Sequence, residues 1–192
     1  MAITSSVSQF LGKIQQGVKP NLFLVDINFP AGHPDAPTGE DKELVDMLCK
    51  SAALPASNLG VIDVPFRGRT VKIAGDRTFD TWTVTFINDK DFKIRGYMER
   101  WLESINAHEG NYSELFVPNQ SAGYTADLKV KQLERDETSS IIREYTIYGA
   151  FPTSVSQIDL AYDANDQIED FTVEFQLQYW KVESGDLTVD KW

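Results

Sequence analysis

IAGDRTFDTWTVTFIND, residues 73–89, carries the clearest structural signals in this chain. Polar residues after Ile73 predict a tight turn that runs directly into a strand. In that strand three large apolar residues alternate with threonines, namely Trp82, Val84 and Phe86. Such period-two alternation is typical of a strand with one buried face. Asn88 and Asp89 then offer side chains that can cap a helix. The segment therefore predicts a turn, a strand and a helix start, and it holds no catalytic arrangement.

Composition sets the size and the general class of the protein. The chain has 192 residues, of which 42% are hydrophobic and 11% aromatic, so it can bury the core of one domain. Its 29 acidic and 18 basic residues give a formal net charge of −11. Because lysine and arginine contacts to phosphates drive nucleic-acid affinity, this balance argues against specific nucleic-acid binding. The acidic balance is still compatible with a protein that contacts a nucleic acid without binding it.

Cysteine content and hydropathy indicate the compartment. Cys49 is the only cysteine, which excludes an intrachain disulfide and a multi-cysteine metal site. The N-terminus lacks an apolar core flanked by basic residues, and no run of about 18 apolar residues occurs. We therefore expect a soluble protein made in a reducing cytoplasm, without a signal peptide or a membrane span.

The first third of the chain predicts strands separated by loops. Residues 21–29 alternate in the manner of a strand, and the following residues 30–41 are rich in proline and glycine. Residues 42–50 fit either one or two helical turns or a short strand, and the pattern does not decide between them. A hairpin is expected from residues 59–66 and 70–73, with its turn at Arg67-Gly68-Arg69.

Clear helical periodicity occurs in one segment. Its apolar residues recur at i, i+3, i+4 and i+7: Ile94, Tyr97, Met98, Trp101, Leu102 and Ile105. Asn88, Asp89 or Asp91 can cap the start, and Gly110 lies just past the end. We expect a helix over residues 91–107, with its apolar stripe closing one side of the core.

The second half predicts further strands: long ones at 124–134 and 141–151, a short one around 158–162, and a two-sided one at 171–179. A polar tail is expected over residues 183–192. The fold class that follows is mainly β, an antiparallel β-sandwich or barrel-like domain with one flanking α-helix.

Residues that could carry chemistry are few. His33 and His108 have no cysteine or histidine at metal-ligand spacing, and no nucleophile elbow or phosphate-binding loop occurs. Asp163, Asn165 and Glu174 match positions one, three and twelve of a calcium loop. Its sixth position should be glycine and is isoleucine here, so an acidic turn is the preferred interpretation. The sequence predicts no enzyme, no cofactor and no metal site.

Four segments together resemble the tail tube proteins of contractile-tailed bacteriophages of the T-even type: KPNLF at residues 19–23, CKSAALPA at 49–56, the opening segment 73–89, and YGAFPTSV at 148–155 continuing to Tyr179-Trp180. Their order and spacing match over about residues 20–180. The resemblance implies a two-sheeted β domain that assembles as hexameric rings stacked into a hollow tube. Strands of neighbouring subunits would join into a continuous barrel around the channel.

The resemblance also implies partners. These are other copies of the chain, the tail sheath protein, the tape measure protein, and the baseplate and tail terminator proteins. Genomic DNA would pass through the lumen without specific binding, and the protein would reside in the tail of the virion after assembly in the host cytoplasm. Two alternatives stay open: an inner tube protein of a contractile injection system, and a carbohydrate- or cell-surface-binding β module.

The expected organisation is an N-terminal arm at residues 1–19, the β domain at 20–181 and a C-terminal tail at 182–192. Residues 1–19, 42–57 and 187–192 are expected to order only against neighbouring subunits. The candidates for subunit contacts are Phe10, Leu11, Leu54, Pro55, Arg67, Arg69 and Trp192. For Arg67 and Arg69, a hairpin tip or a salt bridge between subunits is preferred over a phosphate site.

The acidic excess predicts the electrostatics of a bore. DNA sliding through a ring meets less resistance from neutral or acidic walls, because each lysine or arginine contact adds a salt-dependent attraction. We expect part of the acidic excess to line the lumen. The hairpins at residues 59–73 and 124–151 are the expected suppliers of its strands.

Overall fold

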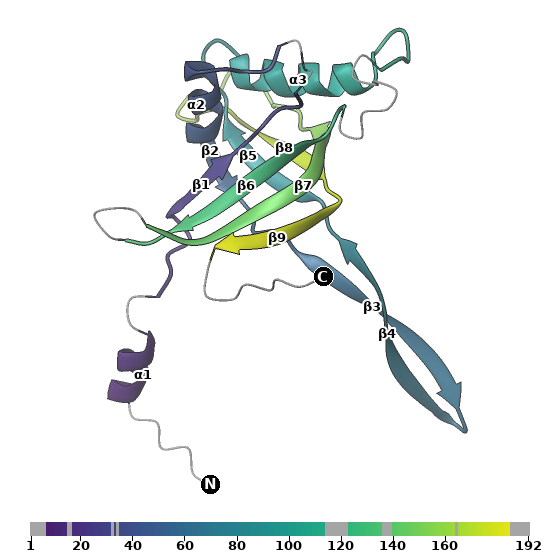
Figure 1. Cartoon of the computed structure of the whole chain (residues 1–192). Coiled ribbons are helices and arrows are strands. Elements are labelled where there is room, and N and C mark those ends of the chain that lie inside the picture. The colour runs from purple at the N-terminus through teal and green to yellow at the C-terminus, as the bar shows by residue number, and fades with distance from the viewer. Residues whose placement is uncertain are drawn as a thin grey trace.

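Seven strands form one continuous antiparallel network that folds over into two layers (Figure 1). The computed structural model describes residues 7–14, 17–31, 33, 35–113, 123–135, 140–163 and 165–184. The front layer contains β1 (Phe23–Asp26), β6 (Ala126–Leu133), the first part of β7 (Ile141–Val155) and β9 (Tyr179–Ser184). The back layer contains β2 (Cys49–Ala52), β5 (Trp82–Ile87), β8 (Asp170–Gln176) and the last part of β7. The predicted antiparallel, mainly β fold is confirmed.

Strand β7 belongs to both layers because it bends at Gly149. Before the bend Tyr148 pairs with Tyr179 of β9, and after it Phe151 pairs with Gln176 of β8. Gly149 has a φ of +61°, and a Cβ at this position would lie 2.8 Å from the Cγ of Gln178. Glycine is therefore required where the paired strands pass from one layer to the other.

The core lies between the layers and draws on both. The front layer contributes Val25, Leu128, Val130 and Ile147, and the back layer contributes Trp82, Val84, Phe86, Phe171, Val173 and Phe175. Each strand presents every second residue to this core, which is the period-two pattern of the sequence. The expected face of β5 is confirmed.

Helix α3 (Lys93–Ile105) closes one end of the sandwich. Ile94, Met98 and Trp101 are fully buried, whereas Leu102 and Ile105 are half-buried. The Asp89 carboxylate accepts hydrogen bonds from the backbone N–H groups of Lys93 and Ile94. The predicted helix is thus confirmed; Phe92 occupies its N-cap position, and the side chain of Asp89, three residues earlier, satisfies its first N–H groups. No helix in the described part of the chain is long and apolar enough to cross a bilayer.

The undecided segment at residues 42–50 contains both alternatives. It forms most of α2 (Glu40–Met47), and β2 begins two residues later. Val45 is fully buried, and Lys42 forms ion pairs with Asp26 and Asp46. Although burial lowers the pKa of Lys42, the two carboxylates raise it overall. The expectation that residues 42–57 order only against neighbours is therefore wrong, because α2 and β2 pack on their own chain.

Four other expectations need correction. The polar residues after Ile73 form no turn, because β4 (Arg69–Phe79) continues through them. Residues 156–163 form no strand, and Leu160 and Tyr162 are exposed. The predicted strand at 171–179 is two strands, β8 and β9, separated at Leu177 and Gln178. Strand β9 continues to Ser184, so the expected start of the C-terminal tail lies within a strand.

Two elements project from the same end of the body, opposite α2 and α3 (Figure 1). One is the hairpin of β3 (Ser57–Phe66) and β4, which forms a separate two-stranded sheet. The other is α1 (Val7–Ile14), which precedes the body. Neither contributes a residue to the fully buried part of the described core, although Phe79 at the end of β4 packs against it.

Trp101 is the side chain whose loss should damage the core most clearly. It is fully buried, its ring lies 5.0 Å from that of Phe29 and 6.0 Å from that of Phe175, and its indole N–H donates to the carbonyl of Tyr124. We expect Trp101→Ala to lower the free energy of unfolding by about 3–5 kcal/mol and to yield insoluble protein. Solubility and denaturant midpoints measure this. Leu102→Ala, half-buried on the same helix, is the control, and a soluble Trp101→Ala with an unchanged midpoint would contradict the assignment.

Candidate assembly surfaces

Nearly all residues of the β3–β4 hairpin are exposed. Its strands pair from Ser57–Phe79 to Phe66–Arg69, and Arg67 and Gly68 form the two-residue turn. Both turn residues have positive φ, 46° and 80°, as the tight hairpin turn matched to strand twist requires. The predicted turn is confirmed, and the hairpin is longer than the sequence indicated.

One face of this hairpin is apolar and open to solvent. Five side chains form it, and we call them the hairpin apolar face: Ile62, Val64, Phe66, Val71 and Ile73. Their exposed fractions range from 39% for Val64 to 62% for Phe66. A two-stranded hairpin is at best marginally stable alone, and an open apolar sheet edge promotes pairing with another chain. This surface therefore has the properties of one that another molecule covers.

The opposite face of the hairpin is more polar. Lys72 and Asp63 form an ion pair of 2.9 Å there, next to Thr70. Near the base the two strands approach closely, because a Cβ on Gly75 would lie 3.2 Å from the backbone of Gly60. The register shifts between Leu59 and Val61 at this point. Gly75 thus allows a bulge inside β4. A glycine among polar residues is also typical of a turn, which explains why the sequence predicted a turn here.

Helix α1 exposes a second apolar surface. Its apolar residues share one face at i, i+3, i+4 and i+7 and have exposed fractions between 49% and 76%: Val7, Phe10, Leu11 and Ile14. An isolated helix of 8 residues is too short to be stable in water. Phe10 and Leu11 are therefore exposed on a helix face that a neighbouring subunit could cover.

The other predicted contact residues have different positions. Leu54 is 49% exposed, and Arg67 and Arg69 lie exposed at the hairpin tip. Pro55 is buried within its own chain, which corrects its assignment as a contact residue. The reason is that the indole N–H groups of Trp82 and Trp180 donate to the carbonyls on either side of it, those of Ala53 and Ala56. Trp192 lies outside the described residues.

The sequence did not single out the hairpin apolar face as a functional surface. Its signal was present as the alternation of residues 62, 64 and 66, but a buried strand has the same alternation. Sequence alone does not show whether such a face meets the chain's own core or the outside.

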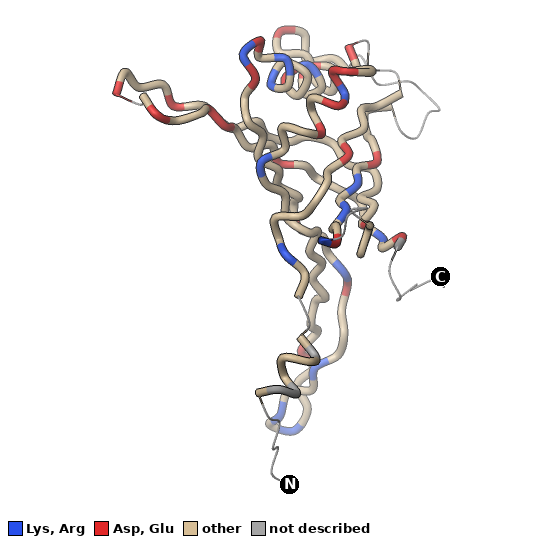
Figure 2. Tube along the Cα trace, turned by 90° about the vertical axis from the view of Figure 1, so that its left-hand side faces the viewer, with Lys and Arg blue, Asp and Glu red and all other residues tan. Residues whose placement is uncertain are grey.

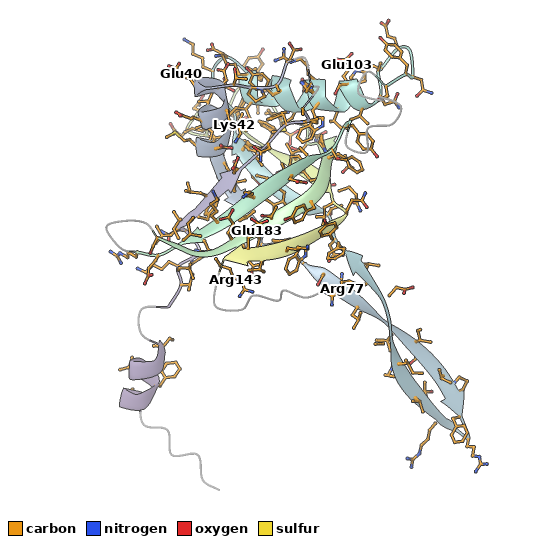
Figure 3. All side chains as sticks on the ribbon, in the orientation of Figure 1. Glu40, Lys42, Arg77, Glu103, Arg143 and Glu183 are labelled. Atoms are coloured by element: carbon orange, nitrogen blue, oxygen red, sulfur yellow. The ribbon has the colours of Figure 1, made fainter. Side chains whose placement is uncertain are left out.

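The outer surface of the front layer carries a connected polar network. Lys129 lies 2.9 Å from Glu144 and 3.6 Å from Glu183, and the Tyr148 hydroxyl donates to Glu183 at 2.7 Å. Figure 3 shows Glu183 on this layer and Arg77 at the base of the hairpin. The hydrogen bond to Glu183, together with burial, raises the pKa of Tyr148 to about 12. Tyr148 also stacks on Tyr179, with ring centroids 4.9 Å apart. Lys129 and these two carboxylates therefore compensate one another's charge.

The residues considered for chemistry are not brought together. His33 is buried beside Phe29, and its Nδ1 accepts a hydrogen bond from the N–H of Asp35. His108 lies at the far end of α3, 3.5 Å from Glu103. Glu174 lies in β8, where an EF-hand has a helix. In the described ranges no group of three or more metal-binding side chains has an arrangement that could hold an ion.

Fold and surfaces together define a class of protein. The body has its own core, while one hairpin and one helix present apolar faces that the described residues of the chain leave open. This arrangement is typical of a subunit whose structure is completed by association with other chains.

Comparison with known proteins gives the family. Residues 18–183 match the family described as phage tail tube protein, and the chain belongs to this family. The chain is 36% identical over 163 residues to tail tube protein gp19 of Enterobacteria phage T4, covering 85% of this chain and 90% of that protein. It is 29% identical over 183 residues to the tail tube protein of Serratia phage KSP90, covering 94% and 97%. The resemblance found in the sequence is confirmed.

Solved structures show the same fold at lower identity. A chain in the baseplate of the anti-feeding prophage matches with a TM-score of 0.60 and 17% identity, covering 86% of this chain and 94% of that one. A chain in the extended sheath–tube complex of an extracellular contractile injection system matches with a TM-score of 0.53 and 14% identity, covering 94% and 99%.

The alkylation rate of Cys49, which lies in β2, reports whether this strand stays packed on the body of the protein. Burial, with a smaller contribution from Asp46, raises the pKa of its thiol from 9.0 to about 12. Because the thiolate is the reactive form, the reactive fraction at pH 8 falls roughly 1000-fold. We expect slow alkylation of the folded protein and fast alkylation in denaturant, measured by mass spectrometry. Equal rates in both conditions would show that β2 detaches in solution.

Proposed function

We propose that this chain is the structural subunit of a contractile phage tail tube that assembles as hexameric rings stacked into a hollow conduit for DNA. The protein resides in the tail of the virion. Family membership supports the tube, and the sixfold ring and the passage of DNA are part of the proposal. No catalytic step is assigned to it.

One observation carries the assembly argument. The hairpin apolar face belongs to a two-stranded sheet that lies outside the buried core of its own chain, apart from Phe79 at its base, which packs against that core. Burying apolar side chains gains roughly 1.5–3 kcal/mol each. Contact with another subunit supplies that burial, so ring and tube formation completes the fold of the hairpin.

Six of the contact residues expected from the sequence remain in the proposal: Phe10, Leu11, Leu54, Arg67, Arg69 and Trp192. The five within the described ranges are exposed on α1, on the loop after β2 and at the hairpin tip. Pro55 acts indirectly, because it helps to fix the segment that presents Leu54.

The outer surface of the front layer is proposed to face the bore. The back layer is the less suitable side, because residues 156–163 and 165–169 protrude beside it and would obstruct a channel (Figure 2). On β6, β7 and β9 the outward-facing charged side chains are balanced: Asp127, Lys129, Lys131, Glu144, Lys181 and Glu183. Asp26 of β1, opposite Lys129, adds one carboxylate, which forms an ion pair with Lys42. The sequence predicted an acidic lining, and the lining that we propose is near-neutral instead. Lysines that pair with carboxylates are less available to DNA phosphates. Strands β6 and β7 supply this wall, in agreement with the sequence expectation for residues 124–151.

The proposed partners are the sheath, tape measure, baseplate and tail terminator proteins. The anti-feeding prophage baseplate and the sheath–tube complex contain chains of this fold. A role as the inner tube of an injection system is the second candidate. The phage relatives at 36% identity favour the phage tail over it.

Ile73→Glu tests the assembly role of the hairpin. Covering this face with another subunit would bury the new carboxylate, which costs about 3 kcal/mol or more and weakens assembly roughly 100-fold. Ala74→Glu adds the same charge on the opposite face, away from the hairpin tip, and is the matched control. Electron microscopy and sedimentation of purified protein measure rings and tubes.

The expected result is tubes with sixfold symmetry from the unaltered protein and from Ala74→Glu, and few or none from Ile73→Glu. Unchanged thermal unfolding of the two variants would show that the body is intact. Tubes formed normally by Ile73→Glu would contradict the role of this face. A purified protein that stays monomeric under all assembly conditions would contradict the tube itself.

A further inference from the structure

The hairpin is basic in an otherwise acidic chain. Residues 57–79 contain four basic side chains and two acidic ones. Arg67 and Arg69 occupy its tip, and the Arg67 guanidinium lies 5.4 Å from the ring of the exposed Phe66. The tip therefore combines positive charge with an open aromatic side chain.

A second projecting segment has the complementary composition. We call residues 156–169 the acidic loop, because they contain four acidic residues and no basic one. Leu160, Tyr162 and Ile168 are 80%, 108% and 76% exposed. A hollow of about 430 Å³ lies between the two arms of the loop, and its lining includes these apolar positions and acids: Ile158, Leu160, Ile168, Asp159 and Glu169. Exposed apolar side chains around a hollow mark a surface that a partner covers.

The acidic loop and the hairpin tip lie at opposite ends of the molecule. Two hydrogen bonds fix the loop to the end of the molecule that carries α3. Arg95 donates to the carbonyl of Ser156 at 3.0 Å, and the backbone N–H of Asn88 donates to the carbonyl of Glu169 at 2.9 Å. The hairpin extends from the other end (Figure 1). In Figure 2 acidic positions gather in the upper part of the molecule, and the projections at the lower end carry mainly basic ones.

We propose that the tip of the β3–β4 hairpin docks on the acidic loop of a second copy of this chain that lies next along the tube. Arg67 and Arg69 face Asp163 and Asp166 of that copy, and Phe66 packs against the exposed side chains of Leu160 and Ile168 that line the hollow. A contact between two different surfaces at opposite ends repeats without closing, so it generates an open stack. This inference rests on the proposed tube function and names its longitudinal contact.

Charge complementarity selects a second copy as the occupant. Opposite charges increase encounter rates and fix the register of a contact, whereas like charges facing each other are costly. Asp163 and Asp166 are exposed, and the positive charges that suit them are present at the tip of the same chain. The other acids of the loop are engaged locally, since Glu169 accepts from Asn88 and Asp159 from Gln157.

Charge reversal on each side provides the test. One variant carries Arg67→Glu and Arg69→Glu, a second carries Asp163→Lys and Asp166→Lys, and a third carries all four changes. Each of the first two should lower the yield of sedimentable tubes roughly tenfold or more at low salt, because like charges then meet at every contact. The four-fold variant should restore tubes. An equimolar mixture of the first two should also restore them, since each hairpin then finds a loop of opposite charge.

The matched control carries Glu103→Lys and Glu109→Lys. It has the same net charge as the variant with Asp163→Lys and Asp166→Lys, called the loop-reversed variant, but its changes lie at the other end of α3. Its tube yield should be unchanged. Thermal unfolding checks that every variant folds. Full tube yield from the loop-reversed variant, or failure of both the four-fold variant and the mixture to recover, would overturn the proposal. A loop-reversed variant that forms tubes normally and loses binding to a basic tail protein would assign the loop to that protein. Absence of tubes from the unaltered protein would instead count against the proposed function.

Discussion

The pairing of β7 with β8 and β9 around Gly149 is the constraint on which the rest of the body depends. It joins the front and back layers through one bent pair of strands, so the core side chains of both layers face each other across a fixed gap. The bend requires a residue with positive φ and no Cβ, because Gln178 occupies the space a side chain would need. Helix α3 covers one end of the gap between the layers. Its Trp101 fills that end and contacts both Phe29 and Phe175.

A body that is complete without its projections allows assembly to be a separate step. The core holds the sandwich together, while the hairpin and α1 keep apolar side chains outside it. Ordering these segments costs conformational entropy, which the subunit alone does not recover and an assembled tube does. The free energy of assembly therefore depends on surfaces whose change leaves the folded body largely unaffected. A tube protein needs this property, because its subunits must be soluble before they polymerise.

The sequence predicted those elements whose local pattern and tertiary environment agree. Strand β5 and α3 are such cases, because their apolar positions match the face that meets the core. The pattern failed where tertiary contacts override it: Gly75 marks a bulge inside a strand, and Leu177–Gln178 interrupts an unbroken alternation where the chain changes layers. The alternation of Ile158, Leu160 and Tyr162 predicted a strand, but no strand in the described part of the chain pairs with it. Among the contact residues, exposure of Arg67 and Arg69 followed from the turn, whereas burial of Pro55 depended on two tryptophans distant in sequence.

Net charge and local charge act at different distances in such a chain. The overall charge of −11 makes separated subunits repel, and salt screens this repulsion beyond a Debye length of about 8–10 Å. At contact distance the local signs decide instead, and there the basic hairpin faces the acidic remainder of another copy. The net charge thus disfavours random association of subunits, while the hairpin gives one orientation in which attraction exceeds repulsion. Asymmetric placement of a few arginines on an acidic body therefore sets the polarity of the stack as well as the affinity of each contact.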